Sequence, residues 1–285
     1  MIMILAAFQL NARNVAVLIG VGNYPSTSQW NAIHSRNDVF LLEQNLKEKG
    51  FMIKSLVDNQ ATKKNIINML KEVIKNSKTG DNVLIHFSCH GQQMVDASKD
   101  EKDERDEAII PYDAQKYYKK NVYTGENHLT DDEFNIYVNK LKTQLGKTGM
   151  IFISIDACHS GDVLRAEQND SIDEELLKFE RGTYYVFASE TKSCKPNSTG
   201  MVKRNKITSK GARIFTVSAC SPNERNFEYI ERHGAAKTFY GSLSYCLSRL
   251  IKESGELSYW ADYFKNKKYI GTGIFPLQNP YYEEF

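Results

Sequence analysis

Two short motifs place a histidine and a cysteine beside glycines, a combination suited to nucleophilic chemistry. They are SCHG at residues 88–91 and DACHSG at residues 156–161. A thiolate is the reactive form of cysteine, and a neighbouring imidazole lowers the thiol pKa and later protonates a leaving amine. Glycine lets the backbone approach a substrate carbonyl, so the amides of Gly91 and Cys158 are candidate oxyanion donors. The motifs predict Cys158 as the nucleophile and His90 as its acid/base partner.

Strand-like apolar runs alternate with amphipathic helical segments along the chain. This alternation is typical of an α/β fold with a mostly parallel sheet and helices on both faces. Ligands of such sheets bind outside the carboxyl ends of the strands. Because His90 follows the third strand and Cys158 follows the fourth, both are expected at the same edge, and on neighbouring strands if the strand order is sequential. The expected strands are 14–21, 51–57, 82–88, 150–156 and 213–220, and the expected helices are 35–49, 61–76 and 239–251.

The two motifs resemble those of the caspase superfamily, in wording closer to metacaspases and their bacterial relatives than to animal caspases. Metacaspases are similar in reading S-G-H-G and D-x-C-H-S-G, and here Cys89 replaces the glycine before His90. The resemblance implies a three-layer caspase-hemoglobinase sandwich and a cysteine endopeptidase that works through an acyl-enzyme. Further similar stretches follow in the family's order: NDV at 37–39, DEAIIPYD at 106–113, LTDDE at 129–133, VSAC at 217–220 and YGSL at 240–243.

The resemblance also divides the chain. It implies a peptidase domain over 14–285, with a large-subunit-like part at 14–165, a linker at 166–212 and a small-subunit-like part at 213–285. Residues 1–13 begin with a short apolar run that lacks the basic start of a complete signal peptide. Two explanations fit this run. It is either a signal-peptide remnant, which implies a secreted or periplasmic protein, or an apolar edge strand of a cytoplasmic one.

Specificity for a basic residue follows from two aspartates that match the metacaspase S1 pocket. The resemblance assigns these roles to Asp38 and Asp156 and implies cleavage after Arg or Lys. Two carboxylates in a dry pocket favour a cation, and Arg satisfies them with paired hydrogen bonds. The alternatives are that Asp38 stabilises a helix N-terminus and that Asp156 orients the cysteine loop.

No cofactor is required by this chemistry, but metacaspases are often activated by calcium. Asp106, Asp131 and Asp132 match parts of the family's acidic cluster, so calcium is the candidate activator. The family's further acid is replaced by Arg165, whose charge repels Ca²⁺ and is able to take its place. The stretch 130–133 also fits a capping box at the start of a helix.

The long connection 163–212 lies where caspases carry their intersubunit linker. An enzyme that prefers basic residues is able to cut itself there, as expected of a zymogen, or the connection is simply a solvated loop. Its basic residues are Arg165, Lys178, Arg181, Lys192, Lys195, Lys203, Arg204, Lys206 and Lys210.

The composition excludes several other classes. The chain has 285 residues and is 41% hydrophobic. Its formal charge of +2 does not favour binding to nucleic acid. No run reaches transmembrane length. Five scattered cysteines without a C-x-x-C pair form neither a disulfide framework nor a zinc site. We therefore expect peptide or protein substrates, no nucleic acid, no membrane span, and a monomer rather than a dimer.

Three rival functions remain open. A gingipain- or CHAT-like peptidase, with a different trigger or partner, would share Cys158 and His90 but need not share Asp38 and Asp156. A catalytically idle caspase-like domain would serve as an interaction module. A Rossmann-type nucleotide binder has only Gly20-Val21-Gly22 in its favour.

The sequence offers no third member of a catalytic triad. We therefore expect a backbone carbonyl to orient the imidazole of His90. His86 is expected inside the third strand, whereas His34, His128 and His233 show no evident partners.

Overall fold

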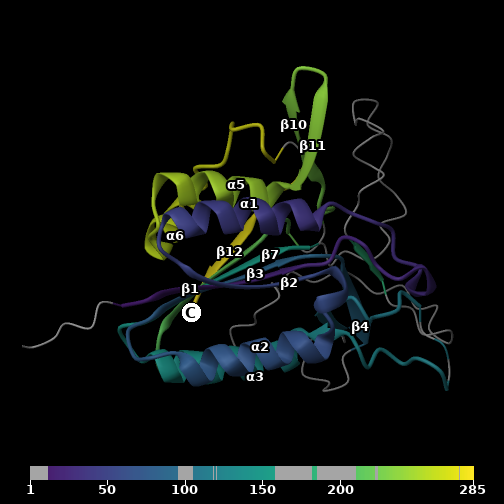
Figure 1. The fold of residues 1–285 in the computed structure, drawn as a ribbon, viewed down its shortest axis with the longest axis horizontal. Helices are drawn as coiled ribbons and strands as arrows, with labels where there is room; N and C mark the ends of the chain where they lie inside the picture. Colours follow the sequence, from purple (N-terminus) through teal and green to yellow (C-terminus); the bar gives the residue numbers. More distant parts are fainter. Residues whose placement is uncertain are drawn as a thin grey trace, which may run out of the picture.

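The computed structural model describes residues 12–95, 105–117, 119, 121–157, 182–184, 210–221, 224–275 and 277–285. Cys158 and most of the predicted linker lie outside these residues. A six-stranded sheet forms the middle layer of the molecule (Figure 1). Its order is β12 (Tyr281–Glu284), β9 (Arg213–Ser218), β7 (Met150–Asp156), β3 (Asn82–Ser88), β1 (Asn14–Gly20) and β2 (Met52–Val57). All neighbours run parallel except β12, which is antiparallel to β9.

Helices cover both faces of this sheet (Figure 1). One face carries α1 (Ser35–Glu48), α5 (Ser242–Glu253) and α6 (Leu257–Lys265), and the other carries α2 (Lys63–Asn76) and α3 (Asp131–Leu145). The predicted mostly parallel α/β architecture is confirmed.

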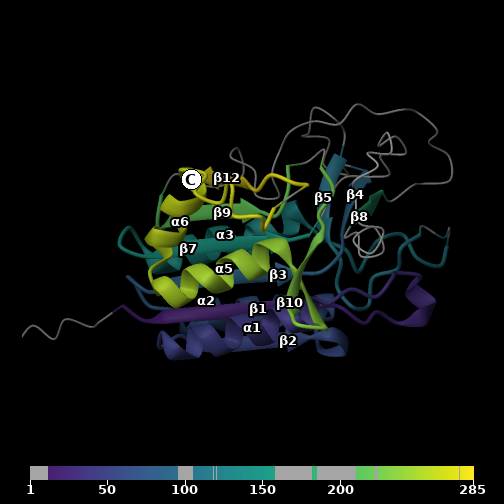
Figure 2. The same cartoon turned by 90° about the horizontal axis from the view of Figure 1, so that it is seen from above.

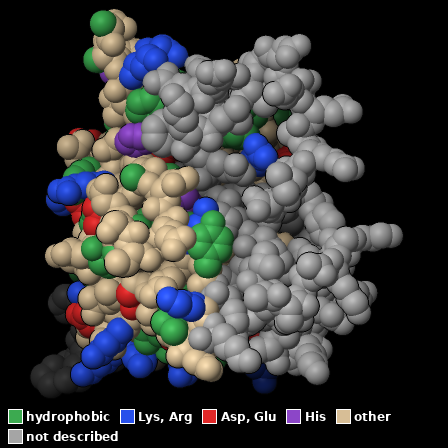
Figure 3. Space-filling view, turned by 90° about the vertical axis from the view of Figure 1, so that its right-hand side faces the viewer, with side chains coloured by type: hydrophobic (Ala, Val, Ile, Leu, Met, Phe, Trp, Pro, Cys, Tyr) green, Lys and Arg blue, Asp and Glu red, His purple; other side chains and the backbone are tan. Residues whose placement is uncertain are grey.

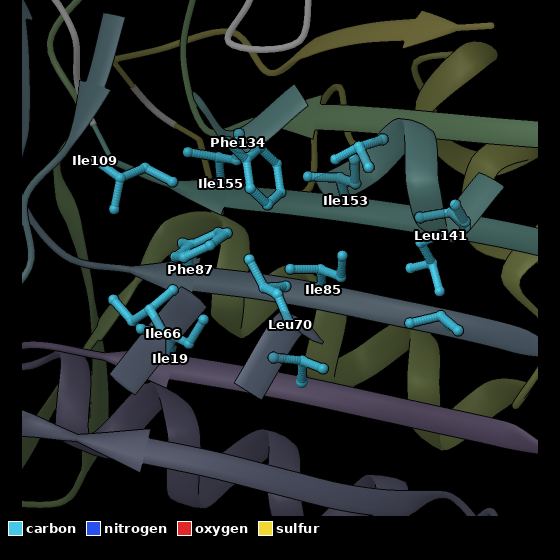
Figure 4. Close-up of a cluster of buried hydrophobic side chains, with 14 of the residues drawn as sticks. Ile19, Ile66, Leu70, Ile85, Phe87, Ile109, Phe134, Leu141, Ile153 and Ile155 are labelled. Carbon is cyan, nitrogen blue, oxygen red and sulfur yellow. The ribbon is translucent and has the colours of Figure 1, made fainter. Parts of the chain in front are cut away.

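Strand β1 shows why the sheet needs two helical layers. Val17 and Ile19 belong to the core on the α2/α3 side, while Ala16 and Leu18 belong to the core on the other side. Successive side chains of a strand point to opposite faces, so a continuous apolar strand must be covered twice. Figure 4 shows the α2/α3-side cluster, including Ile19.

Local signals end and begin the helices as expected. Gly50, directly after the C-cap of α1, has φ 73°, a conformation that glycine adopts without strain. The side chain of Thr130 caps α3 by accepting a hydrogen bond from the Glu133 amide. Thr62 caps α2 in the same way.

Two structural features were not predicted. The segment after β3, for which no strand was expected, contains β4 (Gly91–Val95) and β5 (Arg105–Ile109). These strands join β6 (Leu129–Thr130) and β8 (Gly182–Tyr184) in a second sheet at one end of the molecule (Figure 2). A hairpin of β10 (Glu228–His233) and β11 (Ala236–Gly241) projects above α5 (Figure 1).

The predicted helix 239–251 was therefore wrong at its start. Phe239, Tyr240 and Gly241 pair with β10, and the helix begins at Ser242. Cross-strand hydrogen bonds satisfy these backbone groups before the helix begins. None of the described helices has the length and apolar character that crossing a bilayer requires.

Candidate active site

The strands that carry the two motifs are neighbours in register. Ser88, the last residue of β3, lies opposite Asp156, the last residue of β7, and the amide of Cys89 donates to the Asp156 carbonyl at 3.3 Å. The predicted adjacency of β3 and β7 is confirmed. His90 is two residues beyond Ser88, and Cys158 is two residues beyond Asp156 along the chain. The structure describes His90 and not Cys158.

A backbone carbonyl orients the imidazole of His90, as expected. Its Nε2 lies 2.9 Å from the carbonyl oxygen of Asn31, and the residue is only 2% exposed. A carbonyl only accepts, so Nε2 carries the proton and Nδ1 is the basic nitrogen of the neutral ring. The backbone is fixed as well, because the His90 amide donates to the hydroxyl of Tyr24 at 3.2 Å.

The two predicted S1 aspartates converge on Gly241 from different elements. Asp38 accepts a hydrogen bond from the Gly241 amide at 2.8 Å and another from the Ser88 hydroxyl at 2.5 Å. A Cβ atom at position 241 would overlap the carboxylate of Asp156. Both aspartates are 0% exposed. The structure therefore brings together two residues that are far apart in the sequence.

A polar network that the sequence analysis missed holds Asp156. Its Oδ1 accepts from the side-chain amide of Asn226 at 2.8 Å, and its Oδ2 accepts from the amide and hydroxyl of Ser244 at 2.8 and 2.6 Å. The side-chain amide of Gln278 in turn donates to the side-chain oxygen of Asn226 at 2.7 Å. No motif marks Asn226 or Gln278, because each acts only through a partner distant in the sequence.

The N-terminus of α5 explains part of this arrangement. Ser244 is the third residue of α5, so Asp156 accepts one of the amides that a helix leaves unpaired. The positive end of the helix dipole also stabilises the carboxylate. Asp156 is thus a helix-capping anion whether or not a substrate cation binds.

Several histidines have partners that were not expected. Nδ1 of His34 lies 2.6 Å from a carboxylate oxygen of Glu228. Nε2 of His233 lies 3.3 Å from a carboxylate oxygen of Glu231. The sequence showed no evident partner for these two residues or for His128. Glu228 lies 194 positions from His34, whereas Glu231 lies two residues from His233 in the same strand. His86 is a buried residue of β3, as predicted.

His128 is held in one neutral form. Its Nε2 lies 2.7 Å from the Gln92 side-chain oxygen, and its Nδ1 lies 2.9 Å from the Tyr123 hydroxyl. Burial lowers the pKa of His128 to about 3, with a smaller contribution from the charge of Lys63. Gln92, two residues after His90, is thus hydrogen-bonded to the neutral imidazole of His128.

The remaining predicted residues lie around the second sheet. Gly91, the candidate oxyanion donor, begins β4 and lies opposite Ile109 on one side and Gly182 on the other. Asp131 is 0% exposed at the start of α3, and the side chain of Asp106 lies outside the described part. Among the described residues, no three His, Cys, Asp or Glu side chains gather closely enough to hold a metal ion.

A pocket of about 310 Å³ lies elsewhere. Arg13 and Met52, at the amino ends of β1 and β2, line it together with Ser77 after α2. His90 follows the carboxyl end of β3, so this pocket is not part of the candidate site. Figure 3 looks onto the end of the molecule that carries the second sheet, where the described surface shows side chains of both charge signs.

The chain is similar in sequence to curated metacaspases. Metacaspase-1B of Neurospora crassa is 30% identical over 165 residues, which cover 55% of this chain and 36% of the relative. Metacaspase-2 of Arabidopsis thaliana is 26% identical over 254 residues, which cover 86% of this chain and 53% of the relative. The chain thus spans about a third to a half of the length of these curated relatives.

The fold also agrees with a solved structure. A crystal structure of a protein from Geobacter sulfurreducens matches 95% of this chain and 93% of its own with a TM-score of 0.57, at 19% identity. The predicted caspase-hemoglobinase sandwich is thereby supported at the level of the fold. The family model described as the caspase domain matches residues 13–266. The chain therefore belongs to the caspase family of cysteine peptidases.

Proposed function

We propose that this protein is a cysteine endopeptidase that cleaves protein substrates after Arg or Lys through Cys158 and His90. The observation that carries the proposal is the pairing of Ser88 with Asp156, which brings both motif-bearing strands to one edge of the sheet side by side. Family membership supports the class of reaction. Cys158 lies outside the described residues, and its role comes from the DACHSG motif.

In the proposed reaction, the Cys158 thiolate attacks the substrate carbonyl, and the amides of Gly91 and Cys158 stabilise the oxyanion. His90 gives a proton to the leaving amine, which leaves a thioester. His90 then accepts a proton from water, and the resulting hydroxide attacks the thioester, which releases the acid and restores the Cys158 thiolate beside a protonated His90. The hydrogen bond from Nε2 to Asn31 supports this role, because it leaves Nδ1 for proton exchange.

The proposed preference for a basic P1 residue rests on Asp38 and Asp156. Their carboxylates approach the same glycine, Gly241, in a buried environment. Each carboxylate has acceptor sites for about four hydrogen bonds. A guanidinium would add two paired, charge-assisted bonds, whereas a substrate carboxylate would be repelled by both aspartates.

Self-processing in the linker is a separate proposal. The basic residues of 163–212 match the proposed specificity, and most of that connection lies outside the described residues. Mass spectrometry of the intact protein and of Cys158→Ala tests it. We expect cleavage after one of these residues in the active protein and an intact chain in the variant.

Calcium is proposed only as an activator, and no step of the reaction passes through it. Asp106, Asp131 and Asp132 are the residues in question. Activity measured in calcium and in a chelator decides this point, with Asp131→Asn as the variant that should lose any calcium response.

Fluorogenic peptides with Arg, Lys or Asp at P1 test the proposed function. We expect turnover of the Arg and Lys peptides, no turnover in Cys158→Ala, and labelling of Cys158 by an Arg-directed acyloxymethyl ketone. Asp38→Asn and Asp156→Asn should each lower kcat/KM for Arg peptides by about 100-fold, which corresponds to about 3 kcal/mol of lost charge-assisted bonding. Asp262→Asn is the matched control, since Asp262 is exposed and pairs with Lys268.

Faster turnover of the Asp peptide than of the Arg peptide would overturn the basic preference. If Asp38→Asn and Asp156→Asn each turn over the Arg peptide as fast as the wild type does, a gingipain- or CHAT-like peptidase is favoured. A folded protein that neither turns over peptides nor reacts with the ketone would favour the idle interaction module.

A further inference from the structure

One loop, residues 22–34, surrounds the imidazole of His90 with three kinds of contact. The Asn31 carbonyl accepts a hydrogen bond from its Nε2 at 2.9 Å. The indole of Trp30 stacks on the face of the imidazole, with centroids 4.8 Å apart and an angle of 23° between planes. The ring of Tyr24 lies tilted against it at 5.4 Å and 44°.

The ends of this loop are fixed to the body of the protein. The Gly22 amide donates to the Asp58 carboxylate at 2.9 Å, and the Ile33 amide donates to the Gly22 carbonyl at 3.0 Å. The His34 amide donates to the buried Glu228 carboxylate at 2.9 Å. These hydrogen bonds fix both ends of the loop and thereby position the groups that contact His90.

Packing rather than hydrogen bonding holds Trp30. The residue is 7% exposed and packs with Ile110 and Ala114. Its indole Nε1 is buried and has no hydrogen-bond partner among the described residues. Replacing Trp30 with Phe thus removes no hydrogen bond from the described part of the protein and retains an aromatic face.

We infer that Trp30 is a positioning residue for His90, whose ring face holds the imidazole in its working orientation and stabilises the imidazolium form. This inference rests on the proposed function, in which His90 gains and loses a proton. The face of an indole attracts a cation more strongly than any other side-chain ring does. The stack therefore favours the protonated ring that must form when the Cys158 thiol ionises.

Another positive charge acts against this effect. The Lys116 ammonium lies 5.7 Å from the centroid of the Trp30 ring and 5.6 Å from that of Tyr117. It competes for the same indole and repels an imidazolium. The Tyr24 hydroxyl accepts a hydrogen bond from the His90 amide and donates one to the Ile110 carbonyl. Removing the charge with Lys116→Met should therefore raise the pKa of His90, whereas removing the indole should lower it.

Fluorescence reports on the stack without any catalytic activity. The chain has two tryptophans, Trp30 and Trp260. A protonated imidazole in contact with an indole quenches its emission, and a neutral one does so much less. In Cys158→Ala, we expect emission to fall as the pH is lowered through the pKa of His90, and we expect this step to vanish when His90→Gln is added.

Trp260→Phe assigns the step to Trp30 by leaving Trp30 as the single tryptophan. Trp260 is fully buried, so this variant is expected to destabilise the core. If it does not fold, the difference between Cys158→Ala and Cys158→Ala/His90→Gln still isolates the signal with Trp260 in place.

Comparing Trp30→Phe with Trp30→Met separates the effect of the aromatic face from the effect of side-chain volume. Met fills a space comparable to that of Phe but has no aromatic face. In the Cys158→Ala background, NMR titration of the imidazole should show the pKa of His90 lowered by about one unit in Trp30→Met and by less in Trp30→Phe. In the active protein, kcat/KM should fall about tenfold in Trp30→Met and less than threefold in Trp30→Phe. A tenfold loss in rate corresponds to the same free energy as a pKa shift of about one unit.

The outcomes separate this inference from the proposed function. A His90-dependent quenching step with the expected pKa shifts, in a protein that hydrolyses no peptide, supports the stack and overturns the peptidase. An active peptidase in which Trp30→Met and Trp30→Phe share the same His90 pKa, or which lacks the quenching step, overturns the role of Trp30.

Discussion

Asp156 accepts two hydrogen bonds from Ser244, one from the amide at 2.8 Å and one from the hydroxyl at 2.6 Å. The hydroxyl also lies 3.3 Å from Nε2 of His86. Because its single proton goes to the carboxylate, it accepts from the imidazole, and this links β3, β7 and α5 below the proposed S1 pocket. The charge that is proposed to select Arg is thus fixed from inside the core.

Ser244→Ala is expected to loosen Asp156 without removing its charge. Loss of a hydrogen bond to a charged group should lower the free energy of unfolding by about 1.5–3 kcal/mol. KM for Arg peptides should rise several-fold while kcat changes little, because the variant alters how the P1 side chain is bound. Denaturant unfolding and steady-state kinetics measure the two effects.

Ser248→Ala is the matched control for that variant. Ser248 lies one turn further along α5, is 2% exposed, and donates only to the Tyr245 carbonyl among the contacts described. An equal rise in KM in both variants would mean that Ser244 acts through the stability of α5 and not through Asp156.

Gly241→Ala is expected to be severe although the backbone angles of Gly241 suit alanine. Gly241 has φ −59° and ψ 135°, so no strain arises from the backbone. The added Cβ would instead overlap the Asp156 carboxylate. Overpacking of this kind destabilises by about 1–3 kcal/mol, and we expect activity on Arg peptides to be lost as well.

Gly255→Ala is the control for added volume, because the nearest atom to its Cβ would be the Lys49 Cβ at 3.2 Å, compared with a direct overlap with the Asp156 carboxylate at Gly241. Thermal unfolding should separate the two glycine variants. Wild-type activity in Gly241→Ala would show that the carboxylate moves freely, which argues against a built pocket.

His128 should make the stability of the protein fall in mild acid. Its pKa is about 3 in the folded protein and 6.5 when unfolded, so below pH 6.5 the unfolded chain binds a proton that the folded chain does not. The stability is complete above pH 6.5 and decreases as the pH falls toward 3. Between pH 6.5 and pH 5, the decrease attributable to His128 is about 2 kcal/mol.

His128→Gln should reduce that decrease, since Gln does not titrate and is able to bond to both neighbours. Urea unfolding at pH 7 and pH 5 measures the difference. His233→Gln, on an exposed residue, should behave like the wild type. Identical pH dependence in the wild type and His128→Gln would contradict a buried neutral imidazole.

The cysteines should differ sharply in reactivity. Burial raises the pKa of the Cys246 thiol to about 12, and Cys89 and Cys220 are also buried. In the folded protein at neutral pH, iodoacetamide should modify Cys158 rapidly and leave these three cysteines unmodified until the chain unfolds. Peptide mass spectrometry gives the sites. Rapid modification of Cys246 would contradict the described core, and Cys158→Ala should remove the fast reaction.

Much of the sheet could be predicted because its signals are local. The central strands are continuous apolar runs, and β3 and β7 have the predicted bounds. The short strands were missed because they lack such runs. In β10, only Glu228 is buried, and the rest of the strand is partly or fully exposed. Its structure comes from pairing with β11, which no pattern within one strand reveals.

By itself, the sequence determined the family, the edge of the sheet where the two motifs lie, and the nucleophile and base to be tested. It did so because apolar periodicity and motif spacing are properties of the chain. Only the tertiary structure decided that Asp38 contacts Gly241, 203 positions away, and that Trp30 stacks on His90. These contacts join residues from separate elements, and they form only when packing of the whole core fixes those elements together.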